Sequence, residues 1–463
     1  MDLHTVNHAP DENKYLVSPA AAWFAFAMTI ALMIFDYVDR QVIVSLFPHL
    51  KEEWGLSDKQ LGALVSIVSI TVAVGGIPIA LIADRFSRVK SIVVMATAWS
   101  LATISCMFVR GFPALFAARA VVGLGEAGYG SVGAGLIASH FPSRMRGTLM
   151  AAFFAAASIG SVLGVILGGV IADHWGWKAA FGVVGFPGLA LALLYLFVRD
   201  YKTVELTPKL EAAAQSFGGT ARHIARVLAR SRTMLWLCIA GPAQLIVVSA
   251  IWAWLPSFLV RSHGMTPQAA GIKASLVVLA GAVGSVFWGA VADRVGRRHG
   301  PGAKLRTVAA LCLATMLVIS FAFGAPRLGI TLSDPVQFAL IVLGGLLMIC
   351  HVGPASAAVI DVTHPGVRST GASIMSLFQN LFGLALGPFI AGALSDSIGL
   401  EAALTVTPLA GVIAVFAFLR AATTYQEDAA RASDPLIAKA EARRAQAAPP
   451  ERIRTIFRKR TNP

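Results

Sequence analysis

Charged residues are scarce in this chain, which has 463 residues and carries only 13% Asp, Glu, Lys and Arg against 56% apolar residues. Its mean hydropathy of +0.71 is far above the range of ordinary soluble proteins. Such an excess of apolar side chains has to face lipid, and a segment that crosses a bilayer satisfies its backbone most simply as a helix. The composition therefore predicts an all-α membrane protein.

Cysteine is also rare, and the usual motifs of enzyme sites are absent. The four cysteines, Cys106, Cys238, Cys312 and Cys350, all fall inside apolar runs, which argues against a disulfide framework or a thiolate metal site. The chain contains no GxSxG, HExxH or GxxxxGK[ST] segment. We therefore expect neither an enzyme nor a cofactor, and a transport ATPase would need its nucleotide site on a separate subunit.

Long apolar stretches, in contrast, are numerous. A membrane-spanning helix needs about 20 mostly apolar residues. Twelve stretches meet this requirement, near residues 18–47, 60–83, 91–109, 113–140, 145–172, 179–198, 232–260, 268–292, 307–324, 336–361, 369–394 and 401–420. The sequence therefore predicts twelve transmembrane helices.

The formal net charge of +14 comes from basic residues that lie mostly between these stretches and in the C-terminal tail. If both termini are cytoplasmic, the inner connections carry eighteen Lys and Arg, and the outer connections carry seven. This asymmetry follows the positive-inside rule. We therefore expect a multi-pass protein of the cell inner membrane with both termini in the cytoplasm, and the charge requires no nucleic acid as a partner.

An internal repeat divides the chain into two halves. Residues 84–88 read DRFSR and residues 293–297 read DRVGR, an offset of 209; Asp173 and Asp396 match at an offset of 223. Such a repeat predicts two pseudo-symmetric six-helix halves. The expected regions are an N-terminal segment (1–16), a first bundle (17–199), a cytoplasmic linker with an amphipathic helix (200–231), a second bundle (232–421) and a largely disordered tail (422–463).

Two sets of motifs resemble a known family. Residues 289–298, GAVADRVGRR, resemble the loop signature of the major facilitator superfamily, and residues 80–90, ALIADRFSRVK, resemble a degenerate copy of it. YVDR at 37–40 and RAVVGLGEAGY at 119–129 resemble the spinster-like branch, whose animal members export lysophospholipids or sphingosine phosphate. The resemblance implies the major facilitator fold and a secondary transporter that works by alternating access, and we also expect a monomer. Asp36 stands where many relatives have Asn, which leaves the substrate open.

The two copies of the loop signature are expected to form a gate. A carboxylate beside helix ends can hold a cluster of arginines and a partner helix at the cytoplasmic surface. We hypothesise that Asp84 and Asp293 stabilise the conformation that is closed on that side. The gating set consists of Asp84, Arg85, Arg88, Asp293, Arg294, Arg297, Arg146 and Arg368.

Five charged residues lie within the first and fourth apolar stretches. Asp36, Asp39 and Arg40 share one helical face, and Arg119 and Glu126, seven residues apart, share another. Because a charge at the centre of a spanning helix costs about 2.5 to 3.5 kcal/mol, such residues usually serve function. The family resemblance implies that the first and fourth helices line a central cavity, so the two charged faces are expected to meet there.

Glu126 is the expected proton-coupling residue, with Asp39 and Arg40 as its partners. Burial disfavours its charged form and Arg40 favours it, which suits a group that loads and releases a proton. The expected substrate-binding residues are Arg40, Arg119, Glu126 and Asp36. Two alternatives stay open: Asp39 and Arg40 can brace the helices as a fixed ion pair, and Arg119 can simply balance Asp36 or Asp39.

His351 is a further titratable residue, but a single histidine without a matching carboxylate is more often a packing residue. The sequence thus favours a proton-coupled secondary transporter for an amphiphilic or anionic, lipid-like substrate such as a lysophospholipid or a sphingoid phosphate. Its partners would be membrane lipids, protons and this small substrate. The alternatives are a carrier of small organic anions or drugs and, from another class, a receptor or scaffold that transports nothing.

Overall fold

The structure is a computed structural model that describes residues 15–200, 231–363 and 368–432. The first half contains α1 (Pro19–Ser45), α2 (Phe47–Trp54), α3 (Asp58–Arg85), α4 (Arg88–Ser105), α5 (Phe112–Glu126), α6 (Tyr129–His140), α7 (Ser143–Trp175) and α8 (Trp177–Leu194). The second half contains α11 (Arg232–His263), α12 (Pro267–His299), α13 (Pro301–Gly324), α14 (Asp334–Met348), α15 (Val352–Asp361), α16 (Arg368–Gln379), α17 (Leu386–Ile398), α18 (Leu400–Val406) and α19 (Gly411–Ala432).

The described part of the chain holds twelve spans that are long and apolar enough to cross a membrane, as the sequence predicted. Some spans consist of two helices in line, such as α5 with α6 and α14 with α15. The last span differs from the prediction, because α19 continues to Ala432 instead of ending near residue 421. Its extension packs on the second bundle through the buried residues Tyr425 and Asp428. The predicted amphipathic helix of the linker and the tail after residue 432 lie outside the described residues.

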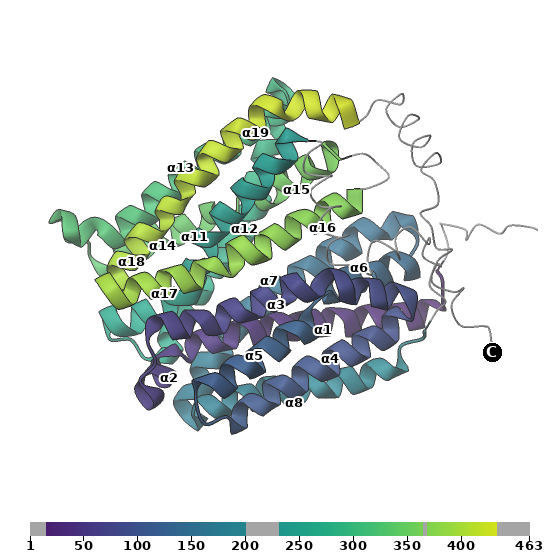
Figure 1. Ribbon diagram of the computed structural model, residues 1–463, viewed down its shortest axis with the longest axis horizontal. Coiled ribbons are helices and arrows are strands. Elements are labelled where there is room, and N and C mark those ends of the chain that lie inside the picture. The colour runs from purple at the N-terminus through teal and green to yellow at the C-terminus, as the bar shows by residue number, and fades with distance from the viewer. Residues whose placement is uncertain (1–14, 201–230, 364–367, 433–463) are drawn as a thin grey trace, which may run out of the picture.

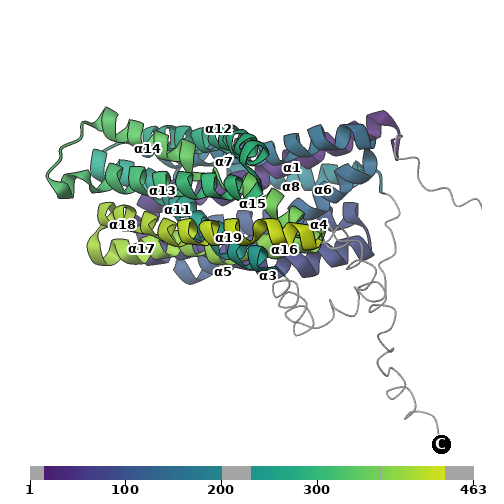
Figure 2. The same ribbon diagram turned by 90° about the horizontal axis from the view of Figure 1, so that it is seen from above.

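The spans form two bundles that lie side by side (Figure 1). Figures 1 and 2 show that α1 begins and α19 ends at the same end of the molecule, which we name the terminal end. The opposite end carries α2 and α18, and we name it the contact end. The helices of the two bundles converge toward the contact end and diverge toward the terminal end (Figure 1).

Glycines allow the two bundles to touch at two crossings. At the crossing of α3 with α17, a Cβ added to Gly62 would lie 2.3 Å from the Pro388 carbonyl oxygen. At the crossing of α7 with α12, a Cβ added to Gly169 would lie 2.6 Å from the Pro267 carbonyl oxygen. Only glycine permits such an approach of two backbones. The two crossings are copies of each other under the sequence repeat, because α3 repeats as α12 and α7 repeats as α17.

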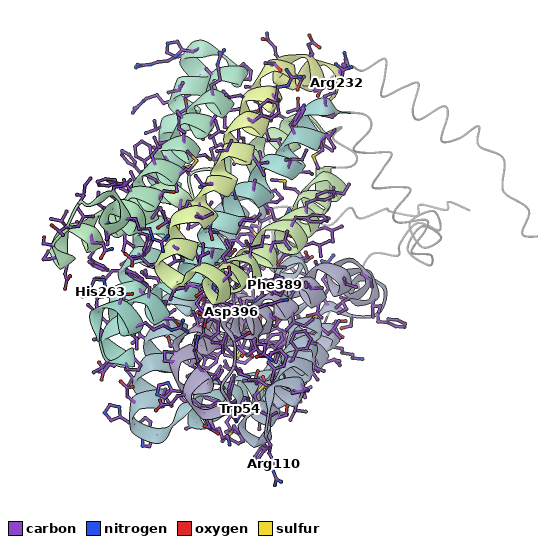
Figure 3. The ribbon with its side chains drawn as sticks, turned by 60° about the vertical axis from the view of Figure 1, so that its left-hand side comes forward. Trp54, Arg110, Arg232, His263, Phe389 and Asp396 are labelled. Atoms are coloured by element: carbon purple, nitrogen blue, oxygen red, sulfur yellow. The ribbon has the colours of Figure 1, made fainter. Side chains whose placement is uncertain are left out.

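Aspartates reinforce both crossings at the contact end. Asp396 accepts hydrogen bonds from the backbone N–H groups of Asp58 (2.7 Å) and Lys59 (2.9 Å), at the first turn of α3. Its repeat partner Asp173 accepts from the backbone N–H of Gln268 (3.1 Å), at the first turn of α12. A carboxylate at a helix N-terminus satisfies free N–H groups and complements the helix dipole. Figure 3 places Asp396 where the two bundles meet.

Asp58 also joins the two bundles through its own side chain. Its carboxylate receives two hydrogen bonds from Arg261 of α11 (2.7 and 2.9 Å), one from Lys51 (2.6 Å) and one from Ser395 (2.5 Å). Arg261 and Ser395 belong to the second bundle, whereas Lys51 belongs to the first. The contact end is therefore closed by polar contacts as well as by backbone packing.

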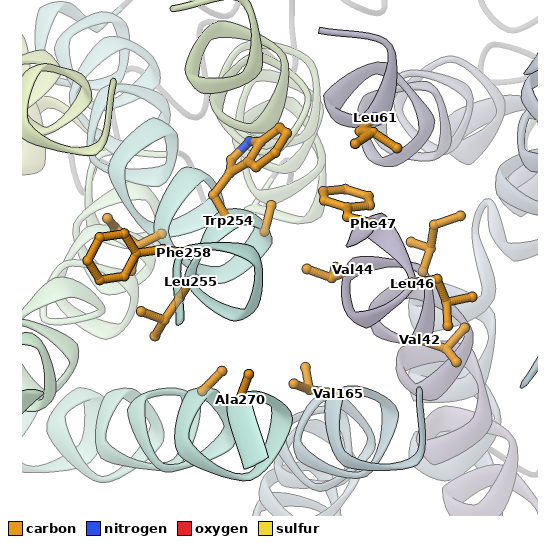
Figure 4. Packing of buried hydrophobic residues seen from close by; sticks show 14 of the residues in the cluster. Val42, Val44, Leu46, Phe47, Leu61, Val165, Trp254, Leu255, Phe258 and Ala270 are labelled. Atoms are coloured by element: carbon orange, nitrogen blue, oxygen red, sulfur yellow. The ribbon is translucent and has the colours of Figure 1, made fainter. Parts of the chain in front are cut away.

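A hydrophobic cluster that spans both bundles lies directly beneath these polar contacts. Phe47 faces Trp254 of α11 with their ring centroids 5.1 Å apart, and Val165 of α7 lies opposite Ala270 of α12 (Figure 4). All four side chains are buried. Burial of apolar side chains from both halves in one cluster closes this end of the interface to solvent.

The packing of α7 against α1 fixes the position of the charged face of α1. Gly160, Gly164 and Gly168 form a stripe on α7, and a Cβ added to any of them would lie within 2.7 Å of a carbonyl oxygen of α1. The two helices therefore touch along their backbones, which leaves the opposite face of α1 for the fourth span. This arrangement directs the charged residues of α1 into the first bundle.

Candidate transport site

The site lies where α1 meets the fourth span, at the junction of α5 and α6. Asp36, Asp39, Arg119 and Glu126 are each at most 3% exposed, whereas the side chain of Arg40 is 17% exposed. The two charged faces predicted from the sequence do meet, which confirms that expectation. They meet as two separate groups, each centred on one arginine.

The first group joins Arg40 to two carboxylates. Arg40 Nε lies 3.0 Å from Asp36 Oδ1, one turn earlier on α1, and donates a hydrogen bond to it. The same Nε atom lies 3.0 Å from Glu126 Oε2 at the end of α5, as an ion pair without hydrogen-bond geometry. The guanidinium group also stacks over the ring of Tyr37, 5.2 Å from its centroid. This group links the first and fourth spans by charge.

The second group joins Arg119 of α5 to Asp39 of α1. Arg119 donates to Asp39 Oδ1 at 2.9 Å and to the Asp39 backbone carbonyl oxygen at 3.3 Å. Thr103 of α4 donates its hydroxyl hydrogen bond to the other carboxylate oxygen, Asp39 Oδ2. All three side chains are buried. In this conformation Arg119 offers no exposed surface to a substrate, which favours the alternative in which it balances Asp39.

The hypothesis of an ion pair between Asp39 and Arg40 is wrong for this conformation. Successive residues of a helix point about 100° apart, so the two neighbours face different partners. Asp39 pairs with Arg119, and Arg40 pairs with Asp36 and Glu126. Asp36, which the sequence placed among the substrate-binding residues or as a partner of Arg119, is a direct partner of Arg40.

A break in the fourth span positions Glu126. Helix α5 ends at Glu126, Gly128 takes a left-handed conformation (φ 84°), and α6 begins at Tyr129. Glycine adopts this conformation without strain. A matching break separates α14 from α15 in the second half, and His351 lies there, buried, with no hydrogen-bond partner for either ring nitrogen in the described structure. The break at Gly128 therefore ends α5 at the level of the charged residues.

The structure describes only part of the predicted gating set. Asp293 forms an ion pair with Lys304 (2.7 Å), and Arg88 donates to the Gly135 carbonyl oxygen (3.0 Å) and to Ser139. Arg146 donates to the Phe141 carbonyl oxygen (3.1 Å), and Arg294 and Arg297 are exposed at the terminal end. The side chains of Asp84, Arg85 and Arg368 lie outside what the structure describes. The gating roles stay predictions.

Sequence reasoning missed two residues of the site, Thr103 and Tyr37. A threonine in a spanning helix usually bonds to a carbonyl of its own helix, as Thr29 and Thr315 do here. Nothing in the sequence near Thr103 distinguishes it from these residues. Tyr37 adjoins the charged face in sequence, and its place three residues before Arg40 was a usable signal for the contact.

The described residues form twelve spans in two pseudo-symmetric bundles, with ion pairs buried between the first and fourth spans, an arrangement typical of secondary membrane transporters. The profile of the Major Facilitator Superfamily matches residues 29–382 and, in a second match, residues 246–461. The chain belongs to the Major Facilitator Superfamily. Its fold, which the motifs predicted, is thereby confirmed.

Within the superfamily the chain is similar to spinster proteins. It is 25% identical over 447 residues to protein spinster homolog 3 of Danio rerio, across 89% of this chain and 87% of the relative. It is 25% identical to the sphingosine-1-phosphate transporter SPNS2 of Danio rerio (79% of this chain, 74% of the relative). It is 26% identical to a gallate transporter of Pseudomonas putida (87% and 92%).

A solved structure shares the fold. The crystal structure of a bacterial homolog to the human lysosomal transporter Spinster, in its inward-facing and occupied conformation, superimposes with a TM-score of 0.77 at 20% identity. The alignment covers 89% of this chain and 99% of the other. This likeness confirms the fold, and the sequence relatives confirm the resemblance to the spinster-like branch.

Proposed function

We propose that this protein is a proton-coupled secondary transporter that works by alternating access, with Glu126 as its coupling carboxylate. The observation that carries the proposal is the shared position of Arg40. One partly exposed guanidinium group lies 3.0 Å from a buried carboxylate of its own helix and 3.0 Å from a buried carboxylate of the fourth span. Its attachment to the fourth span therefore depends on the charge of Glu126.

The coupling follows from this electrostatic arrangement. When Glu126 is ionised, it attracts Arg40 in surroundings that screen charges far less than water does. When Glu126 binds a proton, that attraction is lost and Arg40 becomes available to another anion. A proton and an anionic substrate thus act on the same guanidinium group from opposite sides. This exchange gives each ligand a differential affinity for the two states, which is what a shift of conformational equilibrium requires.

Arg40 is the best candidate to contact the substrate. Of the five intramembrane charges described above, it alone has a partly exposed side chain, and its described contacts to carboxylates use only Nε. The two terminal nitrogens of a guanidinium group match the spacing of two oxygens of a phosphate or a carboxylate. An anionic head group bound there would sit beside the ring of Tyr37.

For the substrate itself we propose an amphiphilic anion such as a lysophospholipid or a sphingoid phosphate. The name of the SPNS2 relative, a sphingosine-1-phosphate transporter, supports this class. A carrier of small organic anions is the second candidate, because a guanidinium group binds a carboxylate as well as a phosphate, and the gallate transporter is a relative of similar identity. We propose a monomer in the cell inner membrane, surrounded by lipids, with both termini in the cytoplasm.

The test is flux through the purified protein in liposomes. Uptake of labelled lysophospholipid, sphingoid phosphate and gallate is measured with and without an imposed pH gradient, for wild type, Glu126→Gln and the control Glu427→Gln. Glu427 is an exposed carboxylate on α19, far along the chain from the site. We expect the gradient to drive one substrate class in the wild type and the control but not in Glu126→Gln.

The outcomes separate the parts of the proposal. Gradient-driven uptake by Glu126→Gln at the wild-type rate would contradict the coupling role of Glu126. Uptake of gallate without uptake of either lipid would favour the second candidate. A wild-type protein that moves none of a wide panel of lipids and metabolites would argue against both substrate classes.

A further inference from the structure

The contacts of Arg40 Nε contain an imbalance between donors and acceptors. A guanidinium Nε carries one hydrogen, yet it has a carboxylate oxygen at 3.0 Å on each of two residues, Asp36 and Glu126. The hydrogen bond goes to Asp36. Both carboxylate oxygens of Glu126 are buried and have no hydrogen-bond partner within the described part of the chain. A fully ionised Glu126 would therefore be a buried acceptor without a donor.

The charges around this pair are also unequal. The ionisable groups that act on Asp36 and Glu126 are Arg40, Tyr37, Asp39, Arg119 and Tyr129, from α1, α5 and α6. Asp39 and Arg119 neutralise each other in their own ion pair. What is left is one guanidinium group for two carboxylates, in a buried place where an excess charge is costly. One additional proton would make the site neutral.

The two carboxylates are close enough to hold that proton together. Because each lies 3.0 Å from the same nitrogen, their nearest oxygens are at most about 6 Å apart, and the two side chains lie within reach of a hydrogen bond to each other. Two carboxylates at such a separation cannot both ionise easily, so one proton is bound by the pair. A protonated Glu126 would donate its O–H to Asp36. It would then no longer be a buried acceptor without a donor.

We propose that Asp36 and Glu126 form a two-carboxylate site that holds one proton between them, beside Arg40. The proton is a ligand of the pair and not of Glu126 alone. The function of this proton in transport rests on the coupling role proposed above for Glu126. The presence of the proton in the resting protein does not depend on that role. Asp36 thereby becomes a coupling residue instead of a substrate-binding one.

The experiment measures the carbonyl-stretch infrared band of protonated carboxylic acids in the purified full-length protein at neutral pH. Spectra are compared for wild type, Asp36→Asn, Glu126→Gln and the control Glu427→Gln. In Asp36→Asn and in Glu126→Gln a single carboxylate remains beside Arg40. The charge of Arg40 balances that carboxylate, so the carboxylate ionises. We expect a band in the wild type and the control, and its loss from both site variants.

Each result supports or overturns the proposal. A band that persists in Asp36→Asn but is lost from Glu126→Gln would show that Glu126 holds the proton without Asp36, which overturns the shared site and leaves the coupling role intact. A wild type without the Glu126-dependent band also overturns it. Thermal unfolding and size-exclusion profiles identify a variant that has not folded. For such a variant, a shorter substitution at the same place, Asp36→Ser or Glu126→Ala, replaces it in the same comparison.

Transport supplies an independent readout. Removing Asp36 removes the neighbouring negative charge that disfavours ionisation of Glu126, so Glu126 binds its proton less tightly. We expect Asp36→Asn to keep gradient-driven uptake but to move the midpoint of its pH profile down by about one pH unit, a tenfold loss of proton affinity. An unchanged midpoint would contradict the shared site. Loss of gradient-driven uptake in Glu126→Gln but not in Asp36→Asn would support the proposed coupling role of Glu126, whatever the midpoint.

Discussion

Arg40 Nε lies 3.0 Å from Glu126 Oε2 and joins the first spanning helix to the fourth at the break after α5. Because Glu126 is buried and Arg40 is partly exposed, the two members of this pair are affected differently by loss of the other. Removing Arg40 leaves two buried carboxylates without their cation. Removing the charge of Glu126 leaves the pair of Arg40 with Asp36 intact.

Arg40→Ala is therefore expected to destabilise the protein more than Glu126→Gln does. Loss of one partner from a buried ion pair typically costs about 3 to 5 kcal/mol. The measurement is thermal unfolding of both variants in the same detergent, with Arg40→Lys as a control that keeps the charge. A Glu126→Gln protein that unfolds at a lower temperature than Arg40→Ala would contradict this order.

Thr103→Val is expected to destabilise the first bundle by about 1.5 to 3 kcal/mol, the usual range for a hydrogen bond to a charged group. Valine keeps the shape of threonine but removes the hydroxyl group that donates to Asp39. Thr103→Ser, which keeps the donor, is the matched control and should lose less. Equal unfolding temperatures for Thr103→Val and the wild type would show that Asp39 does not depend on this bond.

Gly62→Ala is expected to open the contact end. The added Cβ would lie 2.3 Å from the Pro388 carbonyl oxygen, so α3 and α17 can no longer cross at this distance. Gly289→Ala in α12 is the matched control, because its Cβ meets nothing within 4 Å. Spin labels at the exposed positions Glu52 and Ser262, one on each bundle, report the separation. A longer distance in Gly62→Ala alone is the expected result, and identical distances in both variants would contradict it.

The expected orientation can be tested with a thiol reagent that does not cross membranes. Cysteines replace Glu52 at the contact end and Arg431 at the terminal end, both exposed, in a protein whose four native cysteines are buried. In intact cells we expect labelling at position 52 and protection at position 431, because the basic residues gather at the terminal side. The reverse pattern would invert the topology.

The number of spans and the repeat were predictable because hydropathy and sequence offset are properties of the chain alone. The ends of the spans were less so. Helix α12 continues to His299 and α19 to Ala432, past the last apolar residues on which the prediction relied. A helix can extend beyond the lipid when its polar turns pack on neighbours, as Asp428 does with the backbone N–H of Thr233 (2.8 Å).

The meeting of the two charged faces was also predictable, but the partners within it were not. Spacing along a helix allows Arg40 to pair with Asp36. It does not decide which residues Asp39 and Arg119 pair with. The choice depends on how α1 is rotated against α5, and the glycine stripe of α7 sets that rotation through backbone contacts. Hydropathy carries no information about such a rotation.

The two glycine crossings have a consequence for how the contact end opens. Gly62 and Gly169 each touch the opposite bundle's backbone, at two crossings that the repeat relates, and Asp396 and Asp173 tie the same two crossings to helix N-termini. A rigid rotation of one bundle about an axis parallel to the line between the two crossings parts both of them together. The two crossings thus open and close as one unit. A state in which only one of them had opened would admit solvent without completing a transport cycle.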